Sequence, residues 1–506
     1  MVNPLANPIF RREYFVMARS KKAFLAALLL LIALSLILFM LWPRSGVLSQ
    51  FDSNEIFSVF LTANLGIVIL LVPAFTATAI TEEREKGSFD LLFTTSLTPF
   101  EILFGKLASA LAMVFTIVII SMPVTAICAL SGGISVPLLL QTYGIIFLAT
   151  LTYGLVGLAV SALFHRNFSS VMAAYAAIVL LAGAVWLPSV LLGQITPFHD
   201  VWMMLRSLSP FEALFALNQP ARYEIEVGGG AFATSTLQFY TAGMLVLAAI
   251  AFTVFCVFVL RPPQSRKSKA QTQYSDMRTA LKRRLVFPFY LIDPLKRKNP
   301  IARWRNPVFV AELRGKIFGH PKFLLRALAT CIALSLIVLT LVCINFATVL
   351  GPDRVRLVGI LFQFGVVILV APVISSGSIT EERASGTMVL LRMTPLSAFT
   401  VLIGKLKAAF MFLLIFLISS LPVLFSLAYL EVDAAYWRIP AWIATLLLSA
   451  LVFIIMGLFA STIMKNTASA TALSYTMTFV LTIVSLAVLL FGARHSSRRQ
   501  SLHSTR

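Results

Sequence analysis

The chain has 506 residues, of which 59% are hydrophobic and 12% are charged, and its mean hydropathy is +0.92. Soluble domains are about half apolar and about a quarter charged, so this balance excludes an ordinary soluble protein and predicts an integral membrane protein. The formal net charge of +21 is distributed between apolar runs, as the positive-inside rule expects, and does not indicate a nucleic-acid partner.

Apolar segments long enough to cross a bilayer recur along the chain, and their continuous hydrophobicity predicts helices and excludes a barrel. We predict about 11 spans, six in the first half and five in the second, and therefore an all-α polytopic transmembrane helical bundle. The predicted spans are Ala23–Trp42, Phe57–Ile80, Leu107–Leu130, Pro137–Phe164, Ser169–Ile195, Leu237–Leu260, Leu324–Val349, Leu357–Ile379, Leu406–Leu430, Ile439–Met464 and Ala468–Phe491.

Basic residues from Arg11 to Lys22 precede the first span, and no cleavage site of small residues follows it. This predicts an uncleaved span with a cytoplasmic N-terminus. Counted from there, the basic tail after Phe491 falls on the outer side, against the positive-inside rule. Either the last segment does not fully cross, or the chain lacks its final part.

The two halves form a tandem repeat at an offset of 299 residues, and we expect this offset to hold from the first motif through the fifth span. Asn7–Phe10 recurs as Asn306–Phe309. We predict a first transmembrane module over residues 1–260, a basic cytoplasmic linker over 261–305 and a second transmembrane module over 306–506 that lacks a sixth span. Further pairs at this offset are Glu13 and Glu312, Pro73 and Pro372, Gly105 and Gly404, Lys106 and Lys405, Pro123 and Pro422, and Asn167 and Asn466.

A charged motif follows the second span of each copy: "ITEEREKGSFDLL" from Ile80 to Leu92 and "ITEERASGTMVLL" from Ile379 to Leu391. Each charge costs about 3 kcal/mol near the bilayer centre, so the motif marks the cytoplasmic exit of the span. Thr81 and Thr380 are expected to cap a new helix whose first turn holds two glutamates, and the later glycine permits a turn. A capped loop explains the charge, but it does not explain why the order of residues is retained twice.

Together with the "NPxF" opening and the "TPLS…GK" segment, this motif resembles the membrane subunit of type-2 ATP-binding-cassette exporters, over nearly the whole chain and once per half. The resemblance implies an amphipathic helix before the first span, a re-entrant hairpin near Leu208–Asn218, and a coupling helix that docks on an ATP-binding subunit. It assigns the two docking sites to Glu82, Glu83, Arg84 and Gly87, and to Glu381, Glu382, Arg383 and Gly386.

The resemblance requires an ATPase, and no G-x-x-x-x-G-K-[ST] motif stands in the sequence. ATP and Mg²⁺ would therefore be bound by separate subunits, two per chain, and the chain would be neither an enzyme nor a cofactor carrier. No metal cluster or catalytic triad stands out, and all four cysteines lie in apolar runs. We predict an exporter permease of the cytoplasmic (inner) membrane, with the bilayer and the ATPases as partners and no nucleic acid.

Two other classes compete with this prediction. An ion-coupled secondary transporter usually needs ionisable residues inside its spans, and these are nearly absent. A non-transporting membrane scaffold is the third class.

Asn64 and Gln363, related by the same offset, are amides inside the second span of each copy. They either make interhelical hydrogen bonds or line the substrate path at a pseudo-twofold axis.

Overall fold

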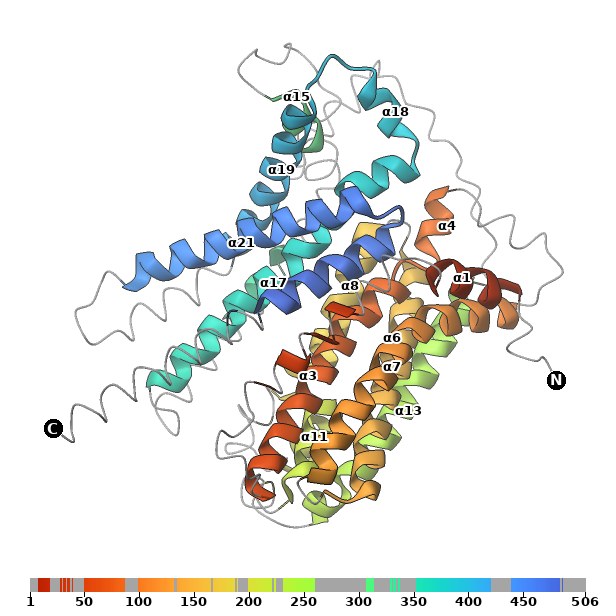
Figure 1. Ribbon diagram of the computed structural model, residues 1–506, viewed down its shortest axis with the longest axis vertical. Coiled ribbons are helices and arrows are strands. Elements are labelled where there is room, and N and C mark those ends of the chain that lie inside the picture. Colours follow the sequence, from red (N-terminus) through yellow and green to blue (C-terminus); the bar gives the residue numbers. More distant parts are fainter. Residues whose placement is uncertain are drawn as a thin grey trace, which may run out of the picture. The chain divides into compact units, whose positions relative to one another are not determined.

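The computed structural model describes residues 8–18, 50–86, 99–131, 134–164, 167–186, 199–220, 231–259, 306–313, 352–419 and 438–482, with short runs of one to three residues elsewhere, such as 34–36 and 331–333. Every regular element in these ranges is a helix, which confirms the predicted all-α fold (Figure 1). A membrane chain must pair its backbone groups within each segment, and helices do so. The predicted linker over 261–305 and the basic tail lie outside the described residues.

The helices of the first half follow the predicted order of spans, with short helices between them. They are α1 (Pro8–Ala18), α3 (Gln50–Thr76), α4 (Thr81–Lys86), α6 (Pro99–Ser131), α7 (Val136–Leu163), α8 (Asn167–Val179) continued by the π-helix η2 (Leu180–Ala184), α10 (His199–Arg206), α11 (Pro210–Asn218) and α13 (Ala231–Val259). Those of the second half are α15 (Pro307–Glu312), α17 (Pro352–Ala384), α18 (Thr387–Arg392), α19 (Ala398–Ser419), α21 (Arg438–Ile463) and a last helix over residues 467–482.

Within the described residues, seven helices are long and apolar enough to cross a membrane, and they overlap predicted spans two, three, four, six, eight, nine and ten. A shorter apolar helix, Asn167–Gly183, overlaps the predicted fifth span. The predicted first and seventh spans lie mostly outside the described residues.

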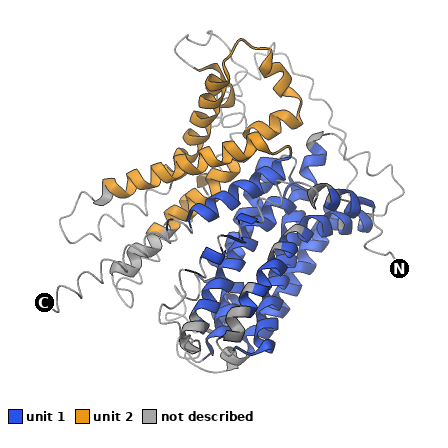
Figure 2. Ribbon diagram, in the orientation of Figure 1, with its two compact units in different colours: residues 1–260, 466–506 blue, residues 261–465 orange. Residues whose placement is uncertain are grey.

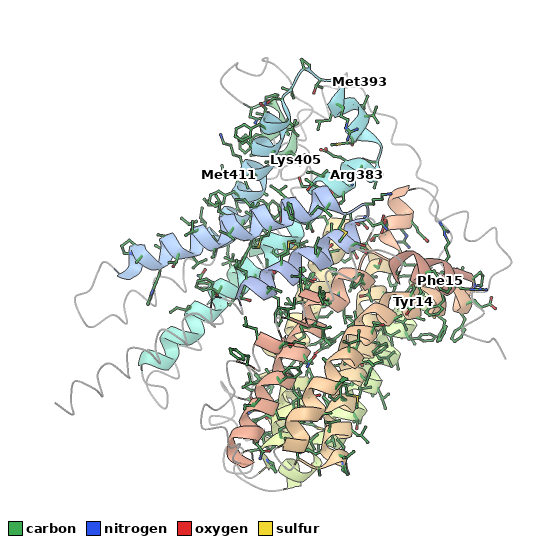
Figure 3. All side chains as sticks on the ribbon, in the orientation of Figure 1. Tyr14, Phe15, Arg383, Met393, Lys405 and Met411 are labelled. Carbon is green, nitrogen blue, oxygen red and sulfur yellow. The ribbon has the colours of Figure 1, made fainter. Side chains whose placement is uncertain are left out.

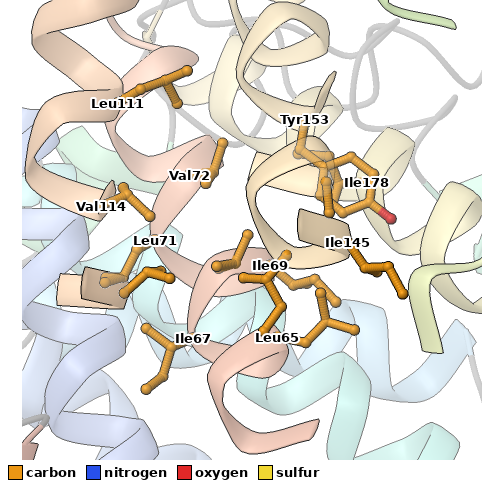
Figure 4. Close-up of a cluster of buried hydrophobic side chains, with 14 of the residues drawn as sticks. Leu65, Ile67, Ile69, Leu71, Val72, Leu111, Val114, Ile145, Tyr153 and Ile178 are labelled. Carbon is orange, nitrogen blue, oxygen red and sulfur yellow. The ribbon is translucent and has the colours of Figure 1, made fainter. Parts of the chain in front are cut away.

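Two compact units contain these helices (Figure 2). The first combines residues 1–260 with 466–506, and the second spans residues 261–465. In the first unit, α3 packs against α6, α7 and α8, and α13 packs against α7. Figure 4 shows the apolar core that results, with Leu65 and Val72 of α3, Leu111 of α6, Tyr153 of α7 and Ile178 of α8 among its buried side chains.

The last helix of the second half belongs to the first unit, where residues three and four apart present one face to the core. Ala472 joins the core of α3 and α7, and Phe479 lies against Gly66 of α3. The ring of Tyr475 lies 4.6 Å from that of Tyr175, centroid to centroid, and both residues are buried. The two copies of the repeat therefore share one core at this point.

Two short helices, α10 and α11, form a helix pair before α13, over the sequence predicted to be a re-entrant hairpin. Arg206 and Glu212 form an ion pair there at 2.7 Å, and the Glu212 side chain is fully buried. The Ser209 hydroxyl donates to the Ala182 carbonyl at 2.6 Å, and α11 packs on α3, α7 and α13. These contacts anchor the helix pair to the first unit.

In the second unit, α17 packs against α21 and α19, and α15 packs on α19. Its core is formed by apolar side chains of the three long helices, including Val367, Leu413 and Ile454, which are fully buried. Within the described residues of the second unit, the charged end of α17 therefore lies among helices of its own half of the chain.

Candidate functional site at the charged helix ends

The charged motif lies where the second span of each copy ends. Glu82, Glu83 and Arg84 belong to α4, and the matching residues from Glu381 to Arg383 form the last turn of α17. Gly386 follows α17, whereas Gly87 lies outside the described residues. The predicted docking residues are thus placed in both copies, except for the first glycine.

The helix start predicted at Thr380 is wrong. Helix α17 continues through this residue to Ala384, and the Thr380 hydroxyl donates to the Ser376 carbonyl at 3.0 Å. A threonine inside a helix can satisfy its hydroxyl in this way and then caps nothing. The new helix, α18, begins instead after Gly386, whose φ of +75° favours glycine at a helix end.

In the first copy the chain does turn before α4, yet the Thr81 hydroxyl again donates backwards, to the Ala77 carbonyl at 3.2 Å. The N–H groups at the start of the motif are satisfied by a serine of the fourth span. Ser161 Oγ accepts from two successive N–H groups at 3.0 and 3.2 Å, and Ser461 Oγ accepts from the equivalent pair at 3.0 and 3.1 Å.

These serines also correct the predicted register. Ser161 and Ser461 are 300 residues apart, although the two motifs that these serines hold are 299 residues apart. Tyr175 and Tyr475 are also 300 residues apart. A single offset therefore does not hold through the fifth span, because the two copies differ by one residue between the third and fourth spans. The contact to the motif is nevertheless retained.

The arginine of each motif points into its own chain. Arg84 Nη1 donates to the carbonyls of Ala162 and Phe164 at 2.7 and 3.1 Å, beside the end of α7. Arg383 makes the same contact at the end of α21, to Met464 at 2.8 Å and Thr462 at 3.3 Å. The last carbonyls of a helix lack partners within it, so each arginine both caps the fourth span and attaches the motif to it.

A buried lysine of the third span holds the second glutamate. Lys106 Nζ lies 2.7 Å from Glu83 Oε1, and Lys405 Nζ lies 2.6 Å from Glu382 Oε1. Lys405 also donates to Glu312 Oε1 of α15 at 2.7 Å, and its side chain is only 1% exposed. From the sequence, these two lysines were predicted as members of the repeat but not as residues of the site. Both copies retain a lysine at the start of the third span, and this was the signal that could have assigned them to the site.

Helix α15 explains the "NPxF" opening. Asn306 caps the helix, because its side-chain oxygen accepts from the N–H groups of Val308 and Phe309, and proline fits the first helical position. Its side-chain amide donates to the Thr400 carbonyl at 2.7 Å. A Cβ at Gly404 would come within 2.8 Å of the Val308 side chain, so this glycine lets α15 approach α19 and brings Glu312 to Lys405.

Two family models match the chain in tandem. Residues 43–260 match one model described as "ABC-2 family transporter protein", and residues 267–503 match a second model with the same description. The chain belongs to the ABC-2 transporter family. Searches among curated proteins and among solved structures gave no match. The two matches confirm the predicted fusion of two permease modules.

An ABC-2 permease is the multi-pass membrane component of a transporter and works with an ATP-binding-cassette ATPase. A surface suited to a partner exists in the second copy of this permease. Helix α18 has no buried residue, and Leu390 and Met393 are 66% and 78% exposed. Met393 is labelled in Figure 3. Exposed apolar side chains that gather in one segment beside charged residues are typical of a protein or membrane contact.

In the first copy of the permease, α1 lies against α6 and presents an aromatic and a basic side. The rings of Phe10 and Tyr14 stack at 5.5 Å, and Arg11 and Arg12 are exposed. This pattern agrees with the predicted amphipathic helix before the first span.

The amides predicted for the substrate path are both buried inside their spans. Asn64 is 1% exposed, and its side chain donates to the Phe60 carbonyl of its own helix at 3.3 Å; Gln363 is fully buried. Their role in transport remains a prediction. Among the described residues, no group of three or more histidine, cysteine or acidic side chains could hold a metal ion.

Proposed function

We propose that this permease belongs to an exporter of the cytoplasmic (inner) membrane and that two ATPase subunits dock on it, one at the charged helix end of each copy. The observation that carries this proposal is the brace that recurs at both ends: a serine, an arginine and a lysine attach each motif to the fourth and third spans of its own half. The resemblance to type-2 exporters supports the direction of transport.

The brace supports a mechanical role for the motif. A force applied to α18 or α4 reaches the fourth span through the arginine and serine contacts and the third span through the lysine. Packed helices joined by short polar contacts move together because their cores deform little. Closing of two ATPases around ATP and Mg²⁺ would then move both halves of the permease, although ATP chemistry takes place in the partners.

The sidedness follows from the charges. The motif carries acids and bases that hydrocarbon does not accept, and the ATPases are expected where ATP is, so we place the motifs, the N-terminus and the linker 261–305 in the cytoplasm. Asn64 and Gln363 are proposed to line the substrate path. Normal transport by an Asn64→Leu/Gln363→Leu double variant would refute that assignment.

The docking experiment uses exposed side chains, because both arginines hold the permease together and their replacement would disturb its own fold. Leu390→Ala/Met393→Ala is expected to weaken binding of the co-expressed ATPase about tenfold, as loss of a central apolar contact does. The matched control, Leu448→Ala/Ile455→Ala, truncates two exposed apolar side chains of α21 in the same unit and should bind normally. Equal binding by both variants would contradict docking at α18.

A further inference from the structure

Two tyrosines that occupy equivalent positions in the repeat touch each other. Tyr175 of α8 and Tyr475 of the last helix both belong to the first unit, and their rings lie 4.6 Å apart, centroid to centroid. In a twofold arrangement, a residue that contacts its own counterpart lies at the axis. We propose that this ring pair is a gate of the substrate path, closed in this structure and opened when the fifth spans of the two copies separate. The inference rests on the proposed function, in which the substrate crosses between the copies.

The ring pair is retained although the helices around it differ. Between residues 167 and 182, only Ser169, Tyr175 and Leu181 recur at the offset of 300. The two helices also begin at matching residues, 167 and 467. The repeat has therefore kept the tyrosine while most of its neighbours changed.

The depth of the ring pair suits a gate. Each tyrosine lies eight residues beyond the start of its helix, which is about 12 Å at the helical rise. Both helices start at the side that we place in the cytoplasm, and the hydrocarbon core is about 30 Å thick. The pair therefore lies near the middle of the bilayer, where transporters built from internal repeats commonly bind their substrates, at the interface of the repeats.

The contact between the rings closes the space between the two helices. Tyr175 is 2% exposed and Tyr475 is fully buried. Aromatic rings at this separation attract each other beyond the burial of their area, but only modestly. Such a pair can close a path and still be separated by the binding of ATP to a partner subunit.

Bonds to α3 connect the gate to the charged motif of the first copy. The Tyr175 hydroxyl donates to the Leu70 carbonyl of α3 at 2.5 Å. The Ser170 hydroxyl of α8 donates to the Ala77 carbonyl at 2.6 Å, just before the motif. Helix α8 is thus bonded at two points, one at the gate and one beside the motif, so a movement of α4 would reach the ring of Tyr175.

The first test joins the two fifth spans covalently. In the full complex with its ATPases, with the native cysteines replaced, Tyr175→Cys/Tyr475→Cys is treated with a short bis-methanethiosulfonate crosslinker. We expect ATP hydrolysis to fall about fivefold, because the spans can no longer separate, and a reductant should restore it. The matched control is Thr125→Cys/Tyr143→Cys, at a 2.7 Å hydroxyl contact between α6 and α7 of one copy. Its crosslinking should leave ATP hydrolysis unchanged.

The second test removes the rings and needs no ATPase. The full permease is placed in vesicles of phosphatidylcholine and phosphatidylglycerol that are loaded with carboxyfluorescein. Tyr175→Ala/Tyr475→Ala is expected to release the dye about tenfold faster than wild type, because the constriction is lost. Tyr175→Phe/Tyr475→Phe keeps both rings and should stay sealed. The control Tyr153→Ala/Tyr240→Ala removes two equally buried rings from α7 and α13 of one copy and should not leak.

The outcomes separate the gate from the proposed function. Unchanged ATP hydrolysis after crosslinking of Tyr175→Cys/Tyr475→Cys would overturn the gate and leave a static packing contact. Dye release by the alanine double variant that is no faster than that of wild type, or that the Tyr153→Ala/Tyr240→Ala control matches, would also overturn it. If the alanine double variant does not fold, Tyr175→Leu/Tyr475→Leu takes its place under the same criteria. A wild-type permease that binds no ATPase would overturn the proposed function, while the dye test would still decide the gate.

Discussion

The charged helix ends of the two copies are held by the same side chains although their backbones differ. In the first copy the chain turns after α3 and begins the separate helix α4, whereas in the second copy α17 continues through the motif to Ala384. The serine, arginine and lysine contacts are present in both. What the repeat preserves is thus the attachment of the motif to the third and fourth spans.

Differences between the copies concern what surrounds this brace. The helix pair of α10 and α11 belongs to the first copy, and Arg12 occupies the position that Ala311 has in the second. A permease made of two identical chains could not vary one site alone. Fusion of two modules would allow each proposed docking site to adapt to its partner while the brace stays the same.

The largest effect is expected from the lysine. Lys405→Met leaves Glu312 and Glu382 without their shared cation, and breaking a buried ion pair typically costs about 3–5 kcal/mol. Thermal unfolding in detergent should show strong destabilisation for Lys405→Met and for its counterpart Lys106→Met. Lys407→Met, at an exposed position two residues further along α19, is the control and should unfold like wild type. A stable Lys405→Met chain would refute the brace.

The serines should have a smaller effect of equal size in both copies. Ser161→Ala or Ser461→Ala removes the acceptor of two buried N–H groups, and an unsatisfied buried donor costs about 1–3 kcal/mol. Thr462→Ala changes an exposed hydroxyl that bonds only within its own helix, so it serves as the control. Unequal destabilisation of the two serine variants, measured by the same unfolding assay, would show that the braces are not equivalent.

The smallest effect is expected at the glycine that separates α17 from α18. Gly386→Ala places a side chain at φ +75°, which costs roughly 1–2 kcal/mol. Gly365→Ala, inside α17 with open space around its Cβ, should instead be neutral or slightly stabilising. The measurement is the difference in unfolding temperature between the two alanine variants. Destabilisation of Gly365→Ala alone would contradict the assigned backbone.

The sequence allowed prediction of the all-α fold, of seven spans now described and of the two fused modules, because apolar length and self-similarity can be read directly from the chain. The helix start at Thr380 was mispredicted because Thr-Glu-Glu is typical of a helix start, while the same hydroxyl can bond four residues back. The roles of Ser461 and Lys405 depend on which spans lie side by side, and a single sequence does not contain that information.

The central claim, that each copy of the repeat docks one ATPase, is tested most directly by the mass of the purified complex. Native mass spectrometry is expected to find one 55.5 kDa permease chain with two ATPase subunits. Leu390→Ala/Met393→Ala should reduce this to one ATPase, bound at the first copy. A complex of two permease chains with two ATPases, or a wild-type permease that binds a single ATPase, would contradict the claim.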